Sequence, residues 1–117
     1  MNIKETDFVQ LVAKINNKLT GYENKHLQDK LAGMLSSYQY NETDKLQIAS
    51  IIRSLIKNHY FVDGNKRTAA VAMFTLADVA GIKMSKDDNE YIDIICDIAA
   101  HQYDVDKIAS MIFDISS

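Results

Sequence analysis

The sequence predicts an all-α fold, a compact bundle of about six helices with one helix buried at its centre. Apolar residues recur at helical spacing along most of the 117 residues, and the one short run that could be extended is 82–84. The chain has no proline, no repeat and no low-complexity tract that would divide it. With 47% hydrophobic residues it can bury a core, so we expect a single domain over residues 1–117.

Two amphipathic helices are expected in the first forty residues. Thr6 or Asp7 can cap the first of them, and Gly21 follows it as a stop. The apolar residues that share one face of this helix are Phe8, Leu11, Val12, Ile15 and Leu19. The second helix is shorter and repeats the spacing with Leu27, Leu31, Met34 and Leu35.

A third and a fourth helix are expected on either side of a polar turn. Thr43 or Asp44 can cap the third, which should end near Asn58. Its inward residues are Ile48, Ile51, Ile52, Leu55 and Ile56. The fourth, from about residue 65 to residue 80, is apolar on nearly every side in "AAVAMFTLADVAG", and Gly81 closes it. This pattern predicts a central helix surrounded by others.

Two further helices complete the expected bundle. Ser85 or Asp87 starts a fifth helix and Asp104 a sixth. The inward residues are Tyr91, Ile94, Ile95 and Ile98 in the fifth, and Val105, Ile108, Met111 and Ile112 in the sixth.

Charge and composition exclude several classes of function. A net charge of -3 and a pI near 5.5 argue against a general nucleic-acid binder or a binder of anionic membranes, so any phosphate site must be local. The most apolar stretch, 68–82, is too short to cross a bilayer and contains a charged residue. The single cysteine cannot form an intramolecular disulfide, and the chain start lacks the apolar run of a signal peptide. We therefore expect a cytoplasmic protein.

The stretch "HYFVDGNKRTAA", residues 59–70, contains the turn that precedes the most apolar helix. A helix start exposes unpaired N–H groups and a partial positive charge, so it attracts anions. Lys66 and Arg67 lie in the first turn of that helix, where cations oppose the helix dipole unless an anion sits in front of them. The pattern is typical of a phosphate site.

Three more residues of this stretch fit chemistry on a phosphate. Gly64 lets the backbone approach a ligand closely, and Asp63 could hold a magnesium ion that bridges phosphate oxygens. His59 is suited to accept a proton near neutral pH. Together they favour phosphoryl or nucleotidyl transfer. The alternative is ordinary turn chemistry, in which Asn65 or Asp63 caps the helix and the two cations are solvated surface.

Other side chains of catalytic type receive structural interpretations. Cys96 stands among isoleucines with nothing basic flanking it, so we interpret it as a small core residue and not a nucleophile. His26 and His101 have no partner nearby in the sequence and are interpreted as surface histidines.

The segment "HYFVDGNKR" resembles the signature of the Fic/Doc family. That signature is a histidine, any residue, phenylalanine, any residue, an acidic residue, glycine or alanine, asparagine, glycine or lysine, and arginine. The residues that match it are His59, Phe61, Asp63, Gly64, Asn65 and Arg67. The resemblance implies the helical Fic/Doc fold and extends from about Thr43 to Ser117, whereas the first forty residues carry little recognisable signal.

The resemblance implies roles for these positions. His59 would be the general base for a target hydroxyl, and Asp63 would hold magnesium. Gly64, Asn65 and the amides that follow would form an anion hole, and Arg67 would grip a phosphate. Phe61 would anchor the loop in the core.

The position of Lys66 separates two branches of the family. Members that transfer AMP usually have glycine there, whereas Doc-like toxins have lysine; Gly64, in contrast, is the choice of the AMP-transferring branch. With Lys66 as a catalytic and phosphate-binding residue, the resemblance implies a Doc-like kinase toxin that phosphorylates a Ser or Thr hydroxyl of a protein such as a translation elongation factor, using ATP and Mg²⁺. An AMP transferase and a non-catalytic binding module remain alternatives. The family's self-inhibitory helix motif is not found, so an antitoxin partner is expected.

Overall fold

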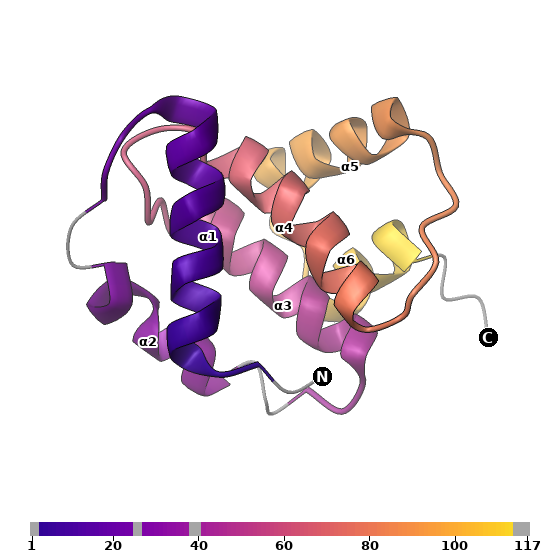
Figure 1. Cartoon of the computed structure of the whole chain (residues 1–117). Coiled ribbons are helices and arrows are strands. Elements are labelled where there is room, and N and C mark those ends of the chain that lie inside the picture. Colours follow the sequence, from indigo (N-terminus) through magenta and orange to yellow (C-terminus); the bar gives the residue numbers. More distant parts are fainter. Residues whose placement is uncertain (1–2, 25–26, 38–40, 114–117) are drawn as a thin grey trace.

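The computed structural model describes residues 3–24, 27–37 and 41–113, and over these residues the chain forms six α-helices and no strand (Figure 1). The helices are α1 (Glu5–Thr20), α2 (Leu27–Ser37), α3 (Asp44–Lys57), α4 (Asn65–Val79), α5 (Asp88–Ala100) and α6 (Val105–Phe113). The predicted all-α class is thus confirmed. The run 82–84, the one short run that could be extended, forms no strand. His26, which we interpret from the sequence as a surface histidine, lies outside the described residues.

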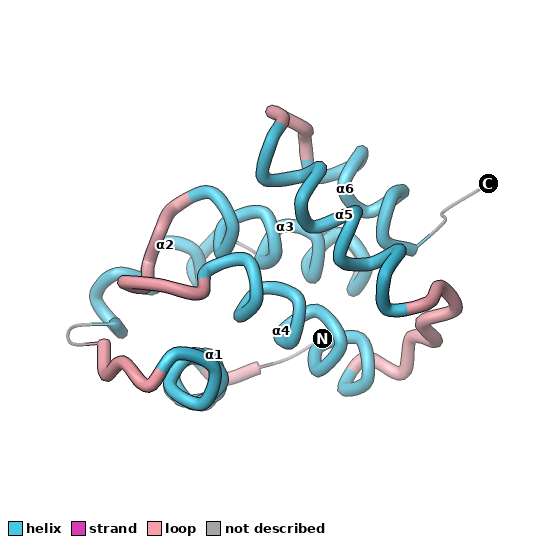
Figure 2. The backbone as a smooth tube through the Cα atoms, turned by 90° about the horizontal axis from the view of Figure 1, so that it is seen from above, coloured by secondary structure: helices cyan, strands magenta, loops and turns pink. Residues whose placement is uncertain are grey.

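Helix α4 lies inside the bundle, as its composition predicts. It packs against α1, α3 and α5, and Figure 2 shows it between α1 and the pair α5 and α6. The enclosure is incomplete, since Val71 and Val79 of α4 are exposed. Helix α3 shares the centre, because it contacts α2, α4, α5 and α6.

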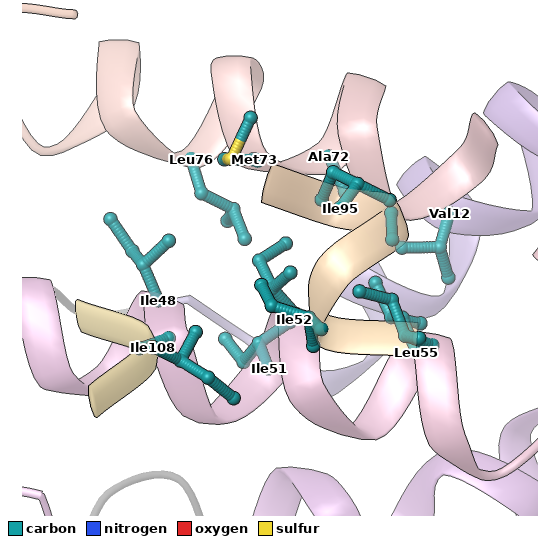
Figure 3. Packing of buried hydrophobic residues seen from close by; sticks show 14 of the residues in the cluster. Val12, Ile48, Ile51, Ile52, Leu55, Ala72, Met73, Leu76, Ile95 and Ile108 are labelled. Atoms are coloured by element: carbon teal, nitrogen blue, oxygen red, sulfur yellow. The ribbon is translucent and has the colours of Figure 1, made fainter. Parts of the chain in front are cut away.

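The core is formed mainly where α3 meets α4. Isoleucines and a leucine of α3 face small and flexible side chains of α4, with contributions from α1, α5 and α6 (Figure 3). The alanines Ala69 and Ala72 of α4 are fully buried, and their small size lets the two helix backbones approach closely. This packing fixes the end of α3 relative to the start of α4, and the segment between those two ends contains the start of the stretch 59–70 singled out in the sequence.

Three of the predicted helix starts are capped as expected. The side chains of Thr43, Asp87 and Asp104 each accept a hydrogen bond from the backbone N–H three residues later, at distances of 3.2, 2.9 and 2.8 Å. Each bond satisfies one of the donors that a helix start leaves open.

The start of α1 differs from the prediction. The helix begins at Glu5 after Lys4, and no side chain caps it, so neither Thr6 nor Asp7 is the cap residue. The expected end is correct: Gly21 has φ +79 and its N–H donates to Asn17 O at 2.8 Å.

Cys96 is exposed, so its interpretation as a core residue is wrong. The inward residues of α5 are Tyr91, Ile95 and Ile98. Because successive helix residues are about 100° apart, Cys96 turns away from Ile95 and lies one turn beyond Ile92, which is 53% exposed. The apolar neighbours in the sequence are therefore on another face of the helix.

His101 is exposed as expected, but it does have a partner four residues earlier in the chain. Its Nδ1 lies 2.8 Å from Asp97 Oδ1. The Tyr103 hydroxyl donates to the same Asp97 oxygen at 3.0 Å, and partial burial together with this carboxylate raises the pKa of Tyr103. The i,i+4 spacing of Asp97 and His101 on a helix end allows this contact.

None of the helices in the described part of the chain combines the length and the apolar character needed to cross a bilayer.

Candidate active site

The segment between α3 and α4, residues 58–64, forms one side of a cavity of about 670 Å³. All six residues predicted for the site line this cavity: His59, Asp63, Gly64, Asn65, Lys66 and Arg67. The other lining residues are Ile56, Lys57, Val62, Ala99 and Gln102. We call residues 59–64 the motif loop.

The far wall of the cavity comes from the end of α5. The ammonium of Lys57, in the last turn of α3, donates hydrogen bonds to the carbonyl oxygens of Ala99 and His101, at 3.1 and 2.6 Å. A cation is favourable at carbonyls left open by a helix end. These two bonds hold the end of α5 next to the end of α3, so the wall and the motif loop are fixed relative to each other.

His59 reaches the cavity through an unusual backbone conformation. Its φ is +49, and no other non-glycine residue in the described ranges has a positive φ. It directly follows Asn58, the cap of α3, at a position where glycine commonly reverses the chain. The side chain is exposed, so an imidazole able to accept a proton stands open to a substrate.

The start of α4 is open toward the cavity. Gly64, with φ +73, occupies the cap position, and no side chain caps this helix. The alternative in which Asp63 or Asn65 caps the helix is therefore wrong. The first-turn N–H groups of the helix remain available for an anion.

Gly64 is also required by packing against α1. A Cβ at this position would lie 2.6 Å from Thr20 Cγ2 and 3.4 Å from Asn16 Nδ2. The positive φ strains any side chain at this position, and the close approach also requires a neighbouring atom to move.

The two cations of the first turn are exposed. Arg67 Nη2 lies 3.5 Å from Asp63 Oδ2, and the two side chains are 58% and 60% exposed. Such an exposed pair contributes little stability, so a phosphate can replace the carboxylate at small cost. The side chain of Lys66 makes no ion pair or hydrogen bond in the described part of the chain. Both side chains are thus available for a ligand.

Asp63 is a suitable ligand for a metal that arrives with a phosphate. Within the described residues, no group of three or more His, Cys, Asp or Glu side chains could hold a metal ion. Magnesium commonly uses one or two carboxylates when phosphates and water supply its remaining ligands. The donor set therefore fits magnesium carried by a nucleotide and does not form a metal cage.

The side chain of Asn65 holds the motif loop. Its Oδ1 accepts from Phe61 N at 3.1 Å and its Nδ2 donates to Phe61 O at 3.0 Å. Phe61 is 4% exposed and belongs to the core, as expected for an anchor of the loop. Asn65 can therefore offer an anion its backbone N–H, because its side chain is already engaged.

Two residues that the sequence analysis missed also contact the motif loop. Asn16 of α1 is fully buried, and its Nδ2 donates to Asp63 O at 2.7 Å and to Thr68 Oγ1 at 3.0 Å. Asn24 donates to Asn16 Oδ1 at 2.9 Å and accepts from Val62 N at 3.2 Å.

A signal for Asn16 was present in the sequence. Phe8 and Val12 are fully buried, and Asn16 continues their i,i+4 row on the inward face of α1. A polar residue at such a position needs buried hydrogen-bond partners, which predicts a contact but not its identity. Asn24, in the connection after α1, had no comparable signal.

The fold and the site thus define an all-helical protein in which a histidine, a carboxylate and an open, cation-flanked helix start line one cavity. The Fic/DOC family model matches residues 6–77, more than half of the chain, and the protein belongs to this family.

One curated relative is informative. "Toxin Doc" of Mycolicibacterium smegmatis (strain ATCC 700084 / mc(2)155) is 36% identical over 64 residues, which cover 53% of this chain and 49% of that protein. The chain thus matches about half the length of this relative. No solved structure matches the chain.

The residues that the family model matches differ from the extent of the family resemblance inferred from the motif. It begins at residue 6, so α1 and α2 carry family signal that was not recognised, and it ends at residue 77 within α4, before α5 and α6. The contacts of Asn16 give a physical reason for including α1, because this helix supports the motif loop.

Proposed function

We propose that the protein is a Doc-like toxin, an ATP-dependent kinase that phosphorylates a serine or threonine hydroxyl of a target protein such as a translation elongation factor. The observation that carries the proposal is the shared cavity, since His59, Asp63 and the cationic start of α4 all line it. Family membership and the similarity to Toxin Doc support it. Because ATP and translation factors occur in the cytoplasm, the proposal includes that location.

The reaction begins at His59. Its exposed imidazole accepts the proton of the target hydroxyl as the hydroxyl oxygen bonds to the terminal phosphorus of ATP. The bond from that phosphorus to the bridging oxygen breaks, and the electron pair leaves with ADP. The products are a phosphorylated side chain, ADP, and a proton carried by His59.

The start of α4 binds the phosphates. First-turn N–H groups and the Arg67 guanidinium donate hydrogen bonds to phosphate oxygens, where donors fixed in place are most effective. Magnesium that arrives with the nucleotide would neutralise charge on those oxygens, and Asp63 would hold it.

Lys66 supports transfer of the terminal phosphate. Its side chain is exposed and without an ion pair in the described residues, so it can neutralise charge on the transferred group. In the pose that transfers AMP, a lysine at this position would occupy space needed by the outer phosphates.

The AMP-transfer alternative rests on Gly64, the residue typical of that branch. In this chain, packing offers a separate reason for glycine, because a Cβ at Gly64 would lie 2.6 Å from Thr20 Cγ2. Gly64 therefore carries less weight than Lys66 in the choice of reaction.

An antitoxin partner is part of the proposal. We expect a small protein whose C-terminal segment covers the cavity over His59 and Arg67 and folds as it binds. An acidic segment would complement Lys66 and Arg67.

The test is transfer from ATP labelled on either the terminal or the innermost phosphate to proteins of a cell lysate. We expect the terminal label on a target protein and no innermost label. His59→Ala should abolish transfer, and Lys66→Gly should reduce it strongly, whereas Lys83→Gly, at another exposed lysine far from the motif in sequence, should leave it unchanged.

The other outcomes identify the alternatives. Incorporation of the innermost label by the unmodified chain would make it an AMP transferase. Binding of ATP without transfer of either label to any protein would support the non-catalytic module.

A further inference from the structure

We propose that Asn16 and Asn24, which lie outside the family motif, are positioning residues of the site. They hold the backbone of the motif loop from α1 and from the connection that follows it. The effect on rate rests on the proposed function, whereas the effect on loop order does not.

The two asparagines bind backbone groups of two consecutive residues of the motif loop. Asn24 Oδ1 accepts from Val62 N at 3.2 Å, and Asn16 Nδ2 donates to Asp63 O at 2.7 Å. The two side chains are also joined, since Asn24 Nδ2 donates to Asn16 Oδ1 at 2.9 Å. The loop is therefore held by a pair of linked amides, in addition to the bonds made by Asn65.

The amide of Asn16 is fixed in one orientation. Its Nδ2 has two acceptors, Asp63 O and Thr68 Oγ1, and its Oδ1 accepts from Asn24 Nδ2 at 2.9 Å. A carbonyl oxygen can only accept, so the nitrogen must face Asp63. Because the side chain is fully buried, rotation away from these partners would leave buried polar atoms unpaired.

The fixed carbonyl of Asp63 sets the direction of the next N–H. The peptide between Asp63 and Gly64 is planar and trans, so its C=O and N–H point in opposite directions. Since the carbonyl points at Asn16, the Gly64 N–H points away from α1. Gly64 lines the cavity, so Asn16 controls the aim of an anion donor without touching the ligand.

Loss of the hydrogen bonds from Asn16 and Asn24 to the motif loop should lower kcat more than it changes KM for ATP. Donors aligned by the scaffold act most strongly on charge that develops in the transition state, and misplacement of reacting groups by 1 Å can cost about 100-fold. A loop that keeps its bonds to Asn65 is still closed, so we expect a reduction of roughly 10-fold.

The variants are chosen to preserve folding. Asn16 is fully buried and its removal can unfold the chain, so the test uses Asn24→Ala at a partly exposed residue. Asn17→Ala is the matched control, because Asn17 is an exposed asparagine that donates to Tyr22 O and makes no bond to the motif loop.

The first measurement is amide hydrogen exchange of the full chain. Asn24→Ala should speed exchange of the Val62 N–H about 10-fold, the effect of losing one ordinary hydrogen bond, with the melting temperature nearly unchanged. Asn17→Ala should not. Equal exchange at Val62 in both variants would overturn the proposal, and this result does not depend on any activity.

The second measurement is the transfer rate with a rescue variant. Thr68→Val removes one of the two acceptors of Asn16 Nδ2 at nearly constant shape, and Thr68→Ser keeps it. We expect kcat to fall for Asn24→Ala and Thr68→Val and to recover for Thr68→Ser, with KM for ATP changed less than about threefold. Rates that follow only the folded fraction of each variant would overturn the positioning role. If the unmodified chain transfers neither label, the proposed function fails. The exchange measurement then still tests whether Asn24 fixes the backbone of the motif loop.

Discussion

His59 has a backbone conformation that glycine would adopt more easily. Left-handed φ angles cost a non-glycine residue about 1–2 kcal/mol, and helix ends of this type usually carry glycine. Over the described residues, its imidazole makes no hydrogen bond or ion pair that would offset the cost. A strained residue at a cavity is a common feature of functional sites, and this favours a role for the side chain in the chemistry.

Two substitutions of His59 should separate strain from chemistry. Both His59→Gly and His59→Ala should abolish transfer, because both remove the proposed base. His59→Gly should also raise the free energy of unfolding by up to about 1 kcal/mol, since it relieves the left-handed conformation, whereas His59→Ala should not. Thermal and urea unfolding of the three proteins measure this difference. Glycine that gives no gain over alanine would show that the histidine backbone is unstrained.

At the scale of elements, the end of α1 supports the start of α4. Thr20 and Asn16 lie against Gly64, and Asn16 binds the carbonyl just before it. The helix that follows the motif therefore begins against a surface made by the first helix. A substitution at this contact in α1 should therefore alter the effect that a substitution at the start of α4 has on the free energy of unfolding.

The contact between Gly64 and Thr20 can be tested by a double-mutant cycle. Gly64→Ala should lower the free energy of unfolding by about 2–3 kcal/mol, because it combines a positive φ with a Cβ 2.6 Å from Thr20 Cγ2. Gly21→Ala has a similar φ of +79 and open space, so it measures the φ cost by itself, about 1 kcal/mol.

Thr20→Ser supplies the second half of the cycle. It deletes the Cγ2 atom and keeps the hydroxyl that donates to Asn16 O. Gly64→Ala combined with Thr20→Ser should recover most of the difference between Gly64→Ala and Gly21→Ala. Strict additivity of the two changes would mean that the steric contact is not what makes glycine necessary.

The same elements show how far the sequence could predict this structure. The caps at Thr43, Asp87 and Asp104 were predictable, because a cap binds an N–H only three residues away. Asn16 binds groups 47 and 52 residues further along the chain, and such partners depend on how the helices pack. Local spacing also misplaced Cys96, because apolar neighbours in sequence can lie on a different face of a helix.

At the scale of the whole molecule, the cavity combines parts from distant segments. The motif loop and the start of α4 come from the region that matches the family, whereas Ala99 and Gln102 on the far wall come from beyond it. Lys57 joins the two parts through its bonds to the end of α5. The motif could predict the first set of residues, but the wall depends on how α5 returns to α3.

The proposed toxin activity makes a prediction for the whole molecule in cells. Induced expression of the unmodified chain should stop growth, because phosphorylation of a translation factor by a catalyst needs few copies of the enzyme. His59→Ala should permit normal growth at the same protein level, and Asn24→Ala should arrest growth more slowly, in line with the lower kcat expected for it. His101→Ala serves as the control, since that histidine is exposed, is bonded to Asp97 and does not line the cavity. If His59→Ala arrests growth as strongly as the unmodified chain, toxicity comes from binding a partner and not from transfer. That result would favour the non-catalytic binding module over the enzyme.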